Sequence, residues 1–237
     1  MEICQIAGNR VPIYYYPNEA LHGFCLCLYL RAGALYEADA DNGITHFFEH
    51  AVFRSLNRRV NGGLYALTDR LGLAFNACTY RELVQFSISG ASEHFAEAVQ
   101  IIAGLFEPLE LSGAEVEMER RRIKAELRES DEQRSLDYFA SRIVWKDTTL
   151  CRSIMGPRAN LDRMGPERLA AAQRDLLTAE NCFFYVTGRA TADDVAALSR
   201  AVSRHELSPA RVVRDNMAPR PAEFFQRQGC VAVKNAD

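Results

Sequence analysis

Residues 43–54 read Gly-Ile-Thr-His-Phe-Phe-Glu-His-Ala-Val-Phe-Arg, and they contain the pattern His-x-x-Glu-His at His46, Glu49 and His50. On a helix, positions i and i+4 share a face and position i+3 lies beside them. Two imidazoles could therefore meet one metal ion, with a carboxylate next to it. Two His ligands, an open position for water and a Glu that takes the water's proton suit a hydrolytic zinc site.

The pattern alone leaves a second interpretation open, because so short a motif also arises by chance. The stretch could be an ordinary amphipathic helix with two partly exposed histidines. Phe47, Phe48 and Phe53 would then be core residues of that helix. A catalytic zinc ion usually has three protein ligands, so the interpretation depends on whether the chain offers a third.

The composition is that of a globular protein. Its 237 residues are 48% hydrophobic, which allows a substantial core in one large domain or two small ones. A net charge of −3 gives no indication of a nucleic-acid partner or of an anionic membrane. The N-terminal residues contain neither a basic stretch nor a long apolar run, so we expect no secretory signal and no membrane span.

The cysteines indicate the compartment. There are seven, an odd number, and none forms a Cys-x-x-Cys pair. We expect reduced thiols, mostly buried as small apolar side chains, in a cytoplasmic protein.

Hydrophobic periodicity and turn residues predict the order of the elements. Strands are expected at residues 2–7, 11–16, 24–32, 73–79, 83–89 and 182–187. Helices are expected at the motif and at residues 64–71, 92–106, 112–130, 137–145, 160–177 and 191–205. These blocks lack a βαβ rhythm, which favours an α+β fold, a two-layer sandwich of a largely antiparallel sheet packed with helices. We expect Asn42 or Thr45 to cap the motif helix.

One domain followed by a short C-terminal segment is expected. Residues 1–208 would form the zinc-binding catalytic domain, and 209–237 a Pro-containing linker or C-terminal arm with a short strand at 230–233. The arm is inferred from Pro209, Pro219 and Pro221.

The helix expected at 112–130 offers two candidates for a third ligand. On a helical wheel, Glu119 and Glu126 lie on the flank of the apolar stripe that Val116, Ile123 and Leu127 form. A buried carboxylate needs hydrogen bonds, a cation or a metal. Alternatively, both carboxylates are exposed and pair with neighbouring arginines, and the wheel does not separate the two interpretations.

The motif together with the segment Glu119-Arg-Arg-Arg-Ile-Lys-Ala-Glu126-Leu resembles the pitrilysin/insulinase family of inverzincin zinc peptidases, which includes the mitochondrial processing peptidases. In that family a Glu roughly three-quarters of a hundred residues after the second His is the third zinc ligand, and here Glu126 lies 76 positions after His50 (126 − 50). The segment Phe75-Asn76-Ala77-Cys78-Thr79 is similar to the family's Asn-Ala-x-Thr strand, which lies along the substrate. The resemblance extends over about residues 1–205.

The resemblance implies a role for each matching residue. His46, His50 and Glu126 would bind one Zn²⁺ per chain. Glu49 would be the general base, and Glu119 would hydrogen-bond a ligand histidine. Four residues of the similar strand would bind the substrate, namely Phe75, Asn76, Ala77 and Thr79.

The resemblance also implies a partner. The family usually consists of two similar domains that close around the substrate, and this chain has the length of one of them. We therefore expect a homodimer, or a heterodimer with a similar chain that lacks the zinc motif; a shortened chain is the third possibility. The implied function is a cytoplasmic zinc endopeptidase that cleaves extended peptides such as leader peptides, presequences or small unfolded peptides.

Three other protein classes share single features of this sequence. The metal-dependent S-ribosylhomocysteine lyases also have a His-x-x-Glu-His helix, but they are shorter and use a Cys as third ligand. Relatives in respiratory complexes keep the fold without the chemistry, so a catalytically silent or partner-dependent structural subunit is the main alternative. A thiol protease built on Cys78 is disfavoured because no local signature supports it.

Overall fold

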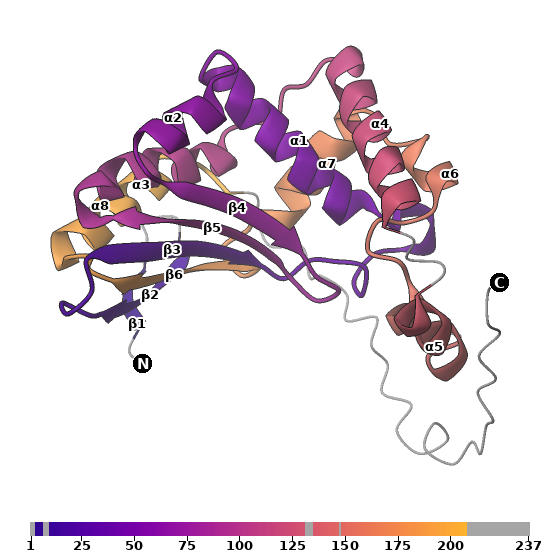
Figure 1. Ribbon diagram of the computed structural model, residues 1–237, viewed down its shortest axis with the longest axis horizontal. Helices are drawn as coiled ribbons and strands as arrows, with labels where there is room; N and C mark the ends of the chain where they lie inside the picture. Colours follow the sequence, from indigo (N-terminus) through magenta and orange to yellow (C-terminus); the bar gives the residue numbers. More distant parts are fainter. Residues whose placement is uncertain (1–2, 7–9, 131–134, 147, 208–237) are drawn as a thin grey trace.

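The structure is a computed structural model that describes residues 3–6, 10–130, 135–146 and 148–207. Its centre is one sheet, with most of the helices on one face (Figure 1). The strands are β1 (Ile3–Ile6), β2 (Pro12–Pro17), β3 (Gly23–Leu30), β4 (Ala74–Thr79), β5 (Val84–Ala91) and β6 (Cys182–Gly188). They lie in the order β1-β2-β6-β3-β5-β4, and only the pair β2–β6 among them is parallel. The predicted α+β fold with a largely antiparallel sheet is confirmed.

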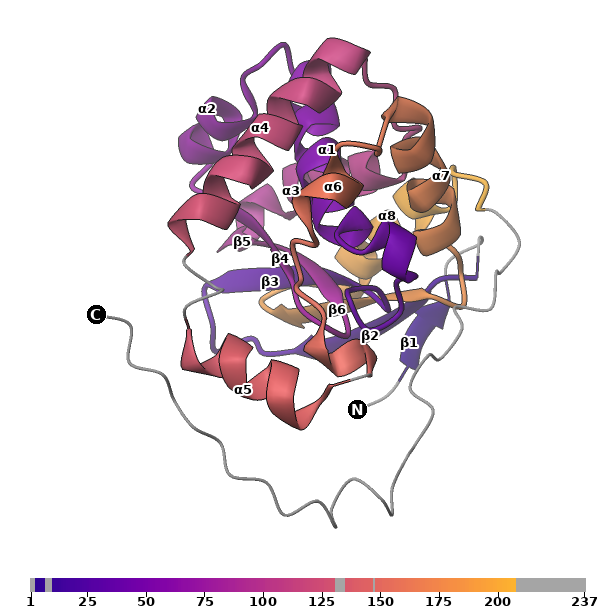
Figure 2. The same ribbon diagram turned by 90° about the vertical axis from the view of Figure 1, so that its right-hand side faces the viewer.

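The α-helices are α1 (Ile44–Arg59), α2 (Leu64–Arg70), α3 (Phe95–Ala103), α4 (Gly113–Glu129), α5 (Leu136–Val144), α6 (Arg158–Leu161), α7 (Pro166–Leu176) and α8 (Ala192–Val202). Helices α3 and α8 pack together against the sheet, and α1 lies between the sheet, α4 and α7 (Figures 1 and 2). None of the described helices is long and apolar enough to cross a membrane.

Helix α1 is held by two hydrophobic clusters, which explains its paired phenylalanines. Phe48 and Val52 belong to the main core between the sheet and helices α3 and α8. Phe47 and Ala51 belong to a second cluster with residues of α4, α6 and α7. All four side chains are at most 2% exposed. Because two sides of the helix are buried in this way, the side that carries the histidines is left to face α4.

The start of α1 differs from the predicted cap. The N-cap residue is Gly43, and neither Asn42 nor Thr45 caps the helix with its side chain. Instead, the buried carboxylate of Glu37 accepts hydrogen bonds from the backbone N–H groups of Gly43 at 2.8 Å and Thr45 at 2.9 Å, and from the side-chain amide of Asn42 at 2.8 Å. A carboxylate is favoured at the positive end of the helix dipole. Glu37, which lies outside the helix, therefore takes the role that the side chain of Asn42 or Thr45 was expected to have.

Three element boundaries also differ from the prediction. The helix expected at 160–177 is two helices, α6 and α7, because Pro166 has no N–H and begins a new helix after Gly165. Helix α1 continues to Arg59, where a loop was expected, and α8 ends at Val202 rather than near residue 205. The helix expected at 112–130 is observed as α4, and a capping box of Ser112 and Glu115 begins it. The predicted arm at 209–237 lies outside the described residues, and the domain boundary remains a prediction.

Candidate metal centre

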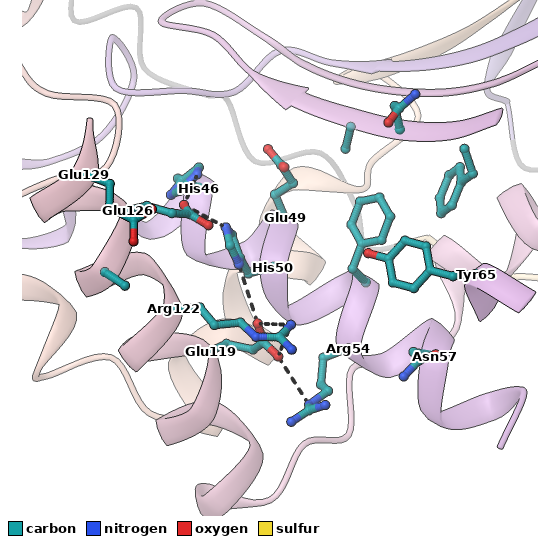
Figure 3. Close-up of a pocket in the computed structure, with 15 residues that line it drawn as sticks. His46, Glu49, His50, Arg54, Asn57, Tyr65, Glu119, Arg122, Glu126 and Glu129 are labelled. Atoms are coloured by element: carbon teal, nitrogen blue, oxygen red, sulfur yellow. Dashed lines mark hydrogen bonds and ion pairs between the residues drawn. The ribbon is translucent and has the colours of Figure 1, made fainter. Parts of the chain in front are cut away.

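Helices α1 and α4 form two walls of a pocket of about 690 Å³. His46, Glu49 and His50 reach into it from α1, and Glu119 and Glu126 from α4 (Figure 3). These are the five residues that the sequence singles out for metal binding and catalysis. Tertiary packing thus brings together two segments that are some 70 residues apart in the chain (119 − 49).

Three of these side chains converge on one point. Nε2 of His46 lies 3.7 Å from Oε2 of Glu126, and Nε2 of His50 lies 3.4 Å from the same oxygen. One ligand atom from each residue lies within 4.8 Å of the other two. Two atoms bound at about 2.1 Å to one tetrahedral ion stand about 3.4 Å apart. The spacing therefore fits a single ion, and two imidazole nitrogens with one carboxylate oxygen form a donor set that suits Zn²⁺.

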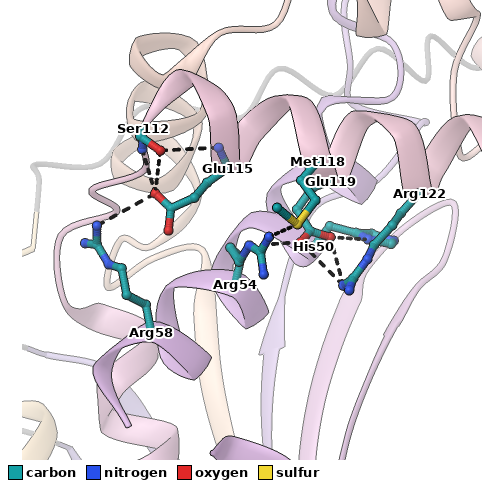
Figure 4. Close-up of polar contacts among 8 residues, drawn as sticks. All are labelled: His50, Arg54, Arg58, Ser112, Glu115, Met118, Glu119 and Arg122. Atoms are coloured by element: carbon teal, nitrogen blue, oxygen red, sulfur yellow. Dashed lines mark hydrogen bonds and ion pairs between the residues drawn. The ribbon is translucent and has the colours of Figure 1, made fainter. Parts of the chain in front are cut away.

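Glu119 lies behind this centre and faces His50. Its carboxylate, 2% exposed, lies 3.5 Å from Nδ1 of His50 (Figure 4). Glu126 lies on the opposite side of the same ring (Figure 3). Arg54 at 3.3 Å and Arg122 at 3.4 Å contact the same carboxylate. Burial raises the pKa of Glu119, but contact with His50 and the charges of the two arginines outweigh burial and hold this pKa below its usual value. Glu119 is therefore an anion that can fix the orientation of His50.

The pKa values of the two histidines are shifted in opposite directions. Burial, with a smaller contribution from His50, lowers the pKa of His46 to about 3, so His46 is neutral near pH 7 and its nitrogen lone pair is free. Burial also lowers the pKa of His50, but contact with Glu119 and the charges of Glu126 and Glu49 reverse this effect and raise it. The carboxylates around His50 therefore favour a positive charge at the point where a cation would bind.

Glu49 lies next to the cluster and does not belong to it. Burial raises its pKa above the usual value, although a hydrogen bond from the hydroxyl group of Thr79 partly opposes this. A carboxylate with a raised pKa is a better proton acceptor. Its position beside the cluster matches the position that a general base needs.

The predicted substrate strand is β4, and it is an edge strand of the sheet. Phe75, Asn76 and Ala77 line the pocket. Thr79 does not line it; this side chain is 9% exposed and bonds to Glu49. The hydrogen-bonding groups on the free side of β4 therefore lie beside the candidate metal centre, while Thr79 contacts the candidate base.

The sequence interpretation missed several pocket residues. Arg54 and Asn57 continue the exposed face of α1, and Tyr65 of α2 contributes a ring to the pocket. Arg54 lies four positions after His50, so helical spacing could have placed it on the same face. Arg122 is mostly exposed and also pairs with the buried Glu119. Glu119 contacts arginines, as one interpretation expected, but it is buried where that interpretation expected it to be exposed. Its support of a ligand histidine stays a prediction.

Comparisons with known proteins show which sequences the chain is similar to. The mouse mitochondrial-processing peptidase subunit beta is 31% identical over 147 residues, which are 61% of this chain and 30% of that protein. The bovine cytochrome b-c1 complex subunit 1 is 27% identical over 139 residues, 58% of this chain and 29% of that protein. The chain thus spans about a third of the length of the curated relatives it matches.

Solved structures share the fold. A protease from Helicobacter pylori superposes with a TM-score of 0.78 at 16% identity, over 89% of this chain and 52% of that one. A peptidase M16 inactive domain from Pseudomonas fluorescens superposes with a TM-score of 0.73 at 14% identity, over 87% and 51% of the two chains. Residues 22–158 match the family described as insulinase (peptidase family M16). This chain belongs to the insulinase family of peptidases.

Proposed function

We propose that this chain is the metal-binding half of a zinc endopeptidase that cleaves extended peptides. The observation that carries the proposal is the convergence of His46, His50 and Glu126 on one point, with Glu49 beside it. These three side chains would hold the ion. A zinc ion bound there supplies the Lewis acidity that lets water lose a proton near neutral pH.

Glu49 is the proposed general base. Its carboxylate accepts the proton of the attacking water and can pass it to the amine that leaves. Its burial supports this role because a pKa nearer to neutral improves proton transfer in both directions. The hydroxyl group of Thr79 holds one carboxylate oxygen, so the other is the one available for the proton.

An extended peptide would bind along β4. As an edge strand, β4 has unpaired backbone groups that can form a ladder with an added strand. Phe75, Asn76 and Ala77 face the pocket and would contact the peptide near the bond that is cleaved. Binding through backbone hydrogen bonds depends little on the side chains of the peptide. This suits leader peptides, presequences and small unfolded peptides as substrates.

We propose that the active form contains a second, similar domain. The solved relatives are about twice the length of the matched region, and one curated relative is named as a peptidase subunit. The second domain would come from another copy of this chain or from a similar chain without the zinc motif. The cysteine composition favours a reducing compartment, so the proposal places this assembly in the cytoplasm.

The variant Glu49→Gln tests the proposal in the native assembly, purified by a tag on this chain. Zinc content by elemental analysis should stay near one ion per chain, and hydrolysis of a fluorogenic unfolded peptide should fall by about 100-fold or more. Glu129→Gln is the matched control, because Glu129 is a pocket carboxylate outside the cluster. Wild-type protein without zinc would refute the site, and full activity in Glu49→Gln would refute the base.

A second candidate is a silent structural subunit. It is favoured by the similarity to the cytochrome b-c1 complex subunit 1 and to the inactive domain from Pseudomonas fluorescens. The same assay separates the two functions: a silent subunit would leave the assembly's hydrolysis unchanged when His50→Ala removes the ligand. The intact cluster of two histidines and one glutamate favours the peptidase.

A further inference from the structure

Two cysteines lie side by side on the sheet, away from the candidate metal centre. Cys25 and Cys27 belong to β3, where they alternate with Phe24, Leu26 and Leu28. Those three side chains are at most 3% exposed and belong to the main core under the helices. Helices α3 and α8 cover one face of the sheet (Figure 1). Since successive side chains of a strand point to opposite faces, both cysteines lie on the face that is turned away from that core.

The two sulfur atoms are 3.6 Å apart. Cys25 is partly exposed and Cys27 is 3% exposed, so solvent reaches the pair mainly at Cys25. The side-chain amide of Gln85 on β5 donates to Sγ of Cys27 at 3.5 Å and also contacts the hydroxyl group of Tyr29 at 3.2 Å. The pair is thus a preformed dithiol.

A disulfide fits this position poorly. Residues i and i+2 of a strand are about 6.6 Å apart, at the upper limit of the Cα separation that a disulfide allows. Strand β3 is hydrogen-bonded on both sides, to β5 and to β6, along its whole length. Closing the sulfur atoms to bonding distance would bend this central strand. Two sulfur ligands of one ion stand about 4 Å apart or more, against the present 3.6 Å, so an ion enters with a small rotation of the two side chains.

We propose that Cys25 and Cys27 form a binding site for one soft, thiophilic cation, Cu(I). Thiolate sulfur selects soft ions such as Cu(I), and also Zn²⁺ in sites with about four ligands. In the part of the chain that the structure describes, the only group of three or more potential ligands is His46, His50 and Glu126. A cation that accepts two sulfur ligands is therefore favoured at the dithiol. Binding displaces the thiol protons that remain, and no electron is transferred.

Competition with a chromophoric Cu(I) chelator under anaerobic, reducing conditions tests the site, with the chain first loaded with zinc. Wild-type protein should withdraw one Cu(I) per chain from the chelator. Cys25→Ser and Cys27→Ser should each weaken that affinity by at least about 100-fold. Cys78→Ser is the matched control, since Cys78 is an exposed thiol on β4, and it should retain the wild-type affinity. Equal copper binding in Cys25→Ser and wild type would overturn the proposal.

A second measurement covers the case in which a variant folds poorly. Wild-type protein is treated with N-ethylmaleimide with and without one equivalent of Cu(I), and the labelled cysteines are mapped by mass spectrometry. Copper should protect the Cys25–Cys27 pair, read at the more exposed Cys25, and leave Cys78 reactive. Protection of Cys78 or Cys151 in their place, or a Cys25–Cys27 disulfide in air-exposed protein, would contradict the proposed site.

Discussion

Nδ1 of His50 lies 3.5 Å from Oε2 of Glu119, so an imidazole of α1 is tied to a buried carboxylate of α4. Glu126, two turns further along α4, faces the other nitrogen of the same ring. One helix therefore offers both a candidate ligand and the group that orients a second ligand. This arrangement leads to the first prediction.

Glu119→Gln should weaken zinc binding by roughly 10–100-fold, because the support of a ligand histidine by a carboxylate is lost. Competition with a zinc chelator measures the affinity. Glu117→Gln is the control: Glu117 pairs with Arg120 and Arg121 on the exposed side of the same helix, and its zinc affinity should equal that of the wild type. Unchanged affinity in Glu119→Gln would show that Glu119 serves the arginines alone.

Glu37→Gln should lower the free energy of unfolding by about 1.5–3 kcal/mol, the range for hydrogen bonds to a buried charged group. The reason is that Glu37 accepts bonds from two N–H groups at the start of α1. Urea denaturation of metal-free protein measures the change. Asp39→Asn, whose side chain is 92% exposed, should change the same quantity by less than about 0.5 kcal/mol. An equal effect of the two variants would contradict the capping role.

The stability of metal-free protein should depend on pH through the two histidines, with opposite signs. The pKa of His46 is lowered to about 3 by burial, from 6.5. Its contribution is complete above about pH 6.5 and is lost as the pH falls, by up to about 2 kcal/mol at pH 5. The pKa of His50 is raised, so its contribution is present below about pH 6.5 and is lost as the pH rises.

Urea denaturation between pH 7 and pH 5, with a chelator present, would separate the two histidines. His46→Gln should remove the loss of stability on the acid side. His50→Gln should make that loss steeper, because the opposing contribution is gone. The prediction fails if both variants follow the pH profile of the wild type.

Gly43→Ala should destabilise the protein by about 2–4 kcal/mol, since an overpacked contact adds to a left-handed backbone. A Cβ atom at Gly43 (φ 99°) would lie 2.4 Å from the carbonyl oxygen of Met155. Gly72→Ala separates the two causes, because Gly72 has φ 60° and no atom within 4 Å of the added carbon. Thermal unfolding should show the larger loss in Gly43→Ala. Equal losses would mean that backbone conformation alone accounts for the effect.

Much of the fold could be predicted because the relevant signals are local. Alternating apolar residues in β3 and the Ser112–Glu115 capping box depend on neighbours in the chain. The errors arose where a distant residue or a single proline changed the outcome. Glu37 caps α1 from outside the helix, and Pro166 divides the helix that was expected at 160–177 into two.

The sequence alone determined which residues could form the site, since helical spacing brings His46, Glu49 and His50 to one face whatever surrounds the helix. It also identified Glu119 and Glu126 as candidates on the flank of an apolar stripe. Only the tertiary structure distinguished them: Glu119 is 2% exposed between His50 and two arginines, while Glu126 is 44% exposed and faces both histidines. The physical reason is that exposure and charge contacts at a helix flank depend on how the partner helix packs, and the packing of α1 against α4 involves residues far apart in the chain.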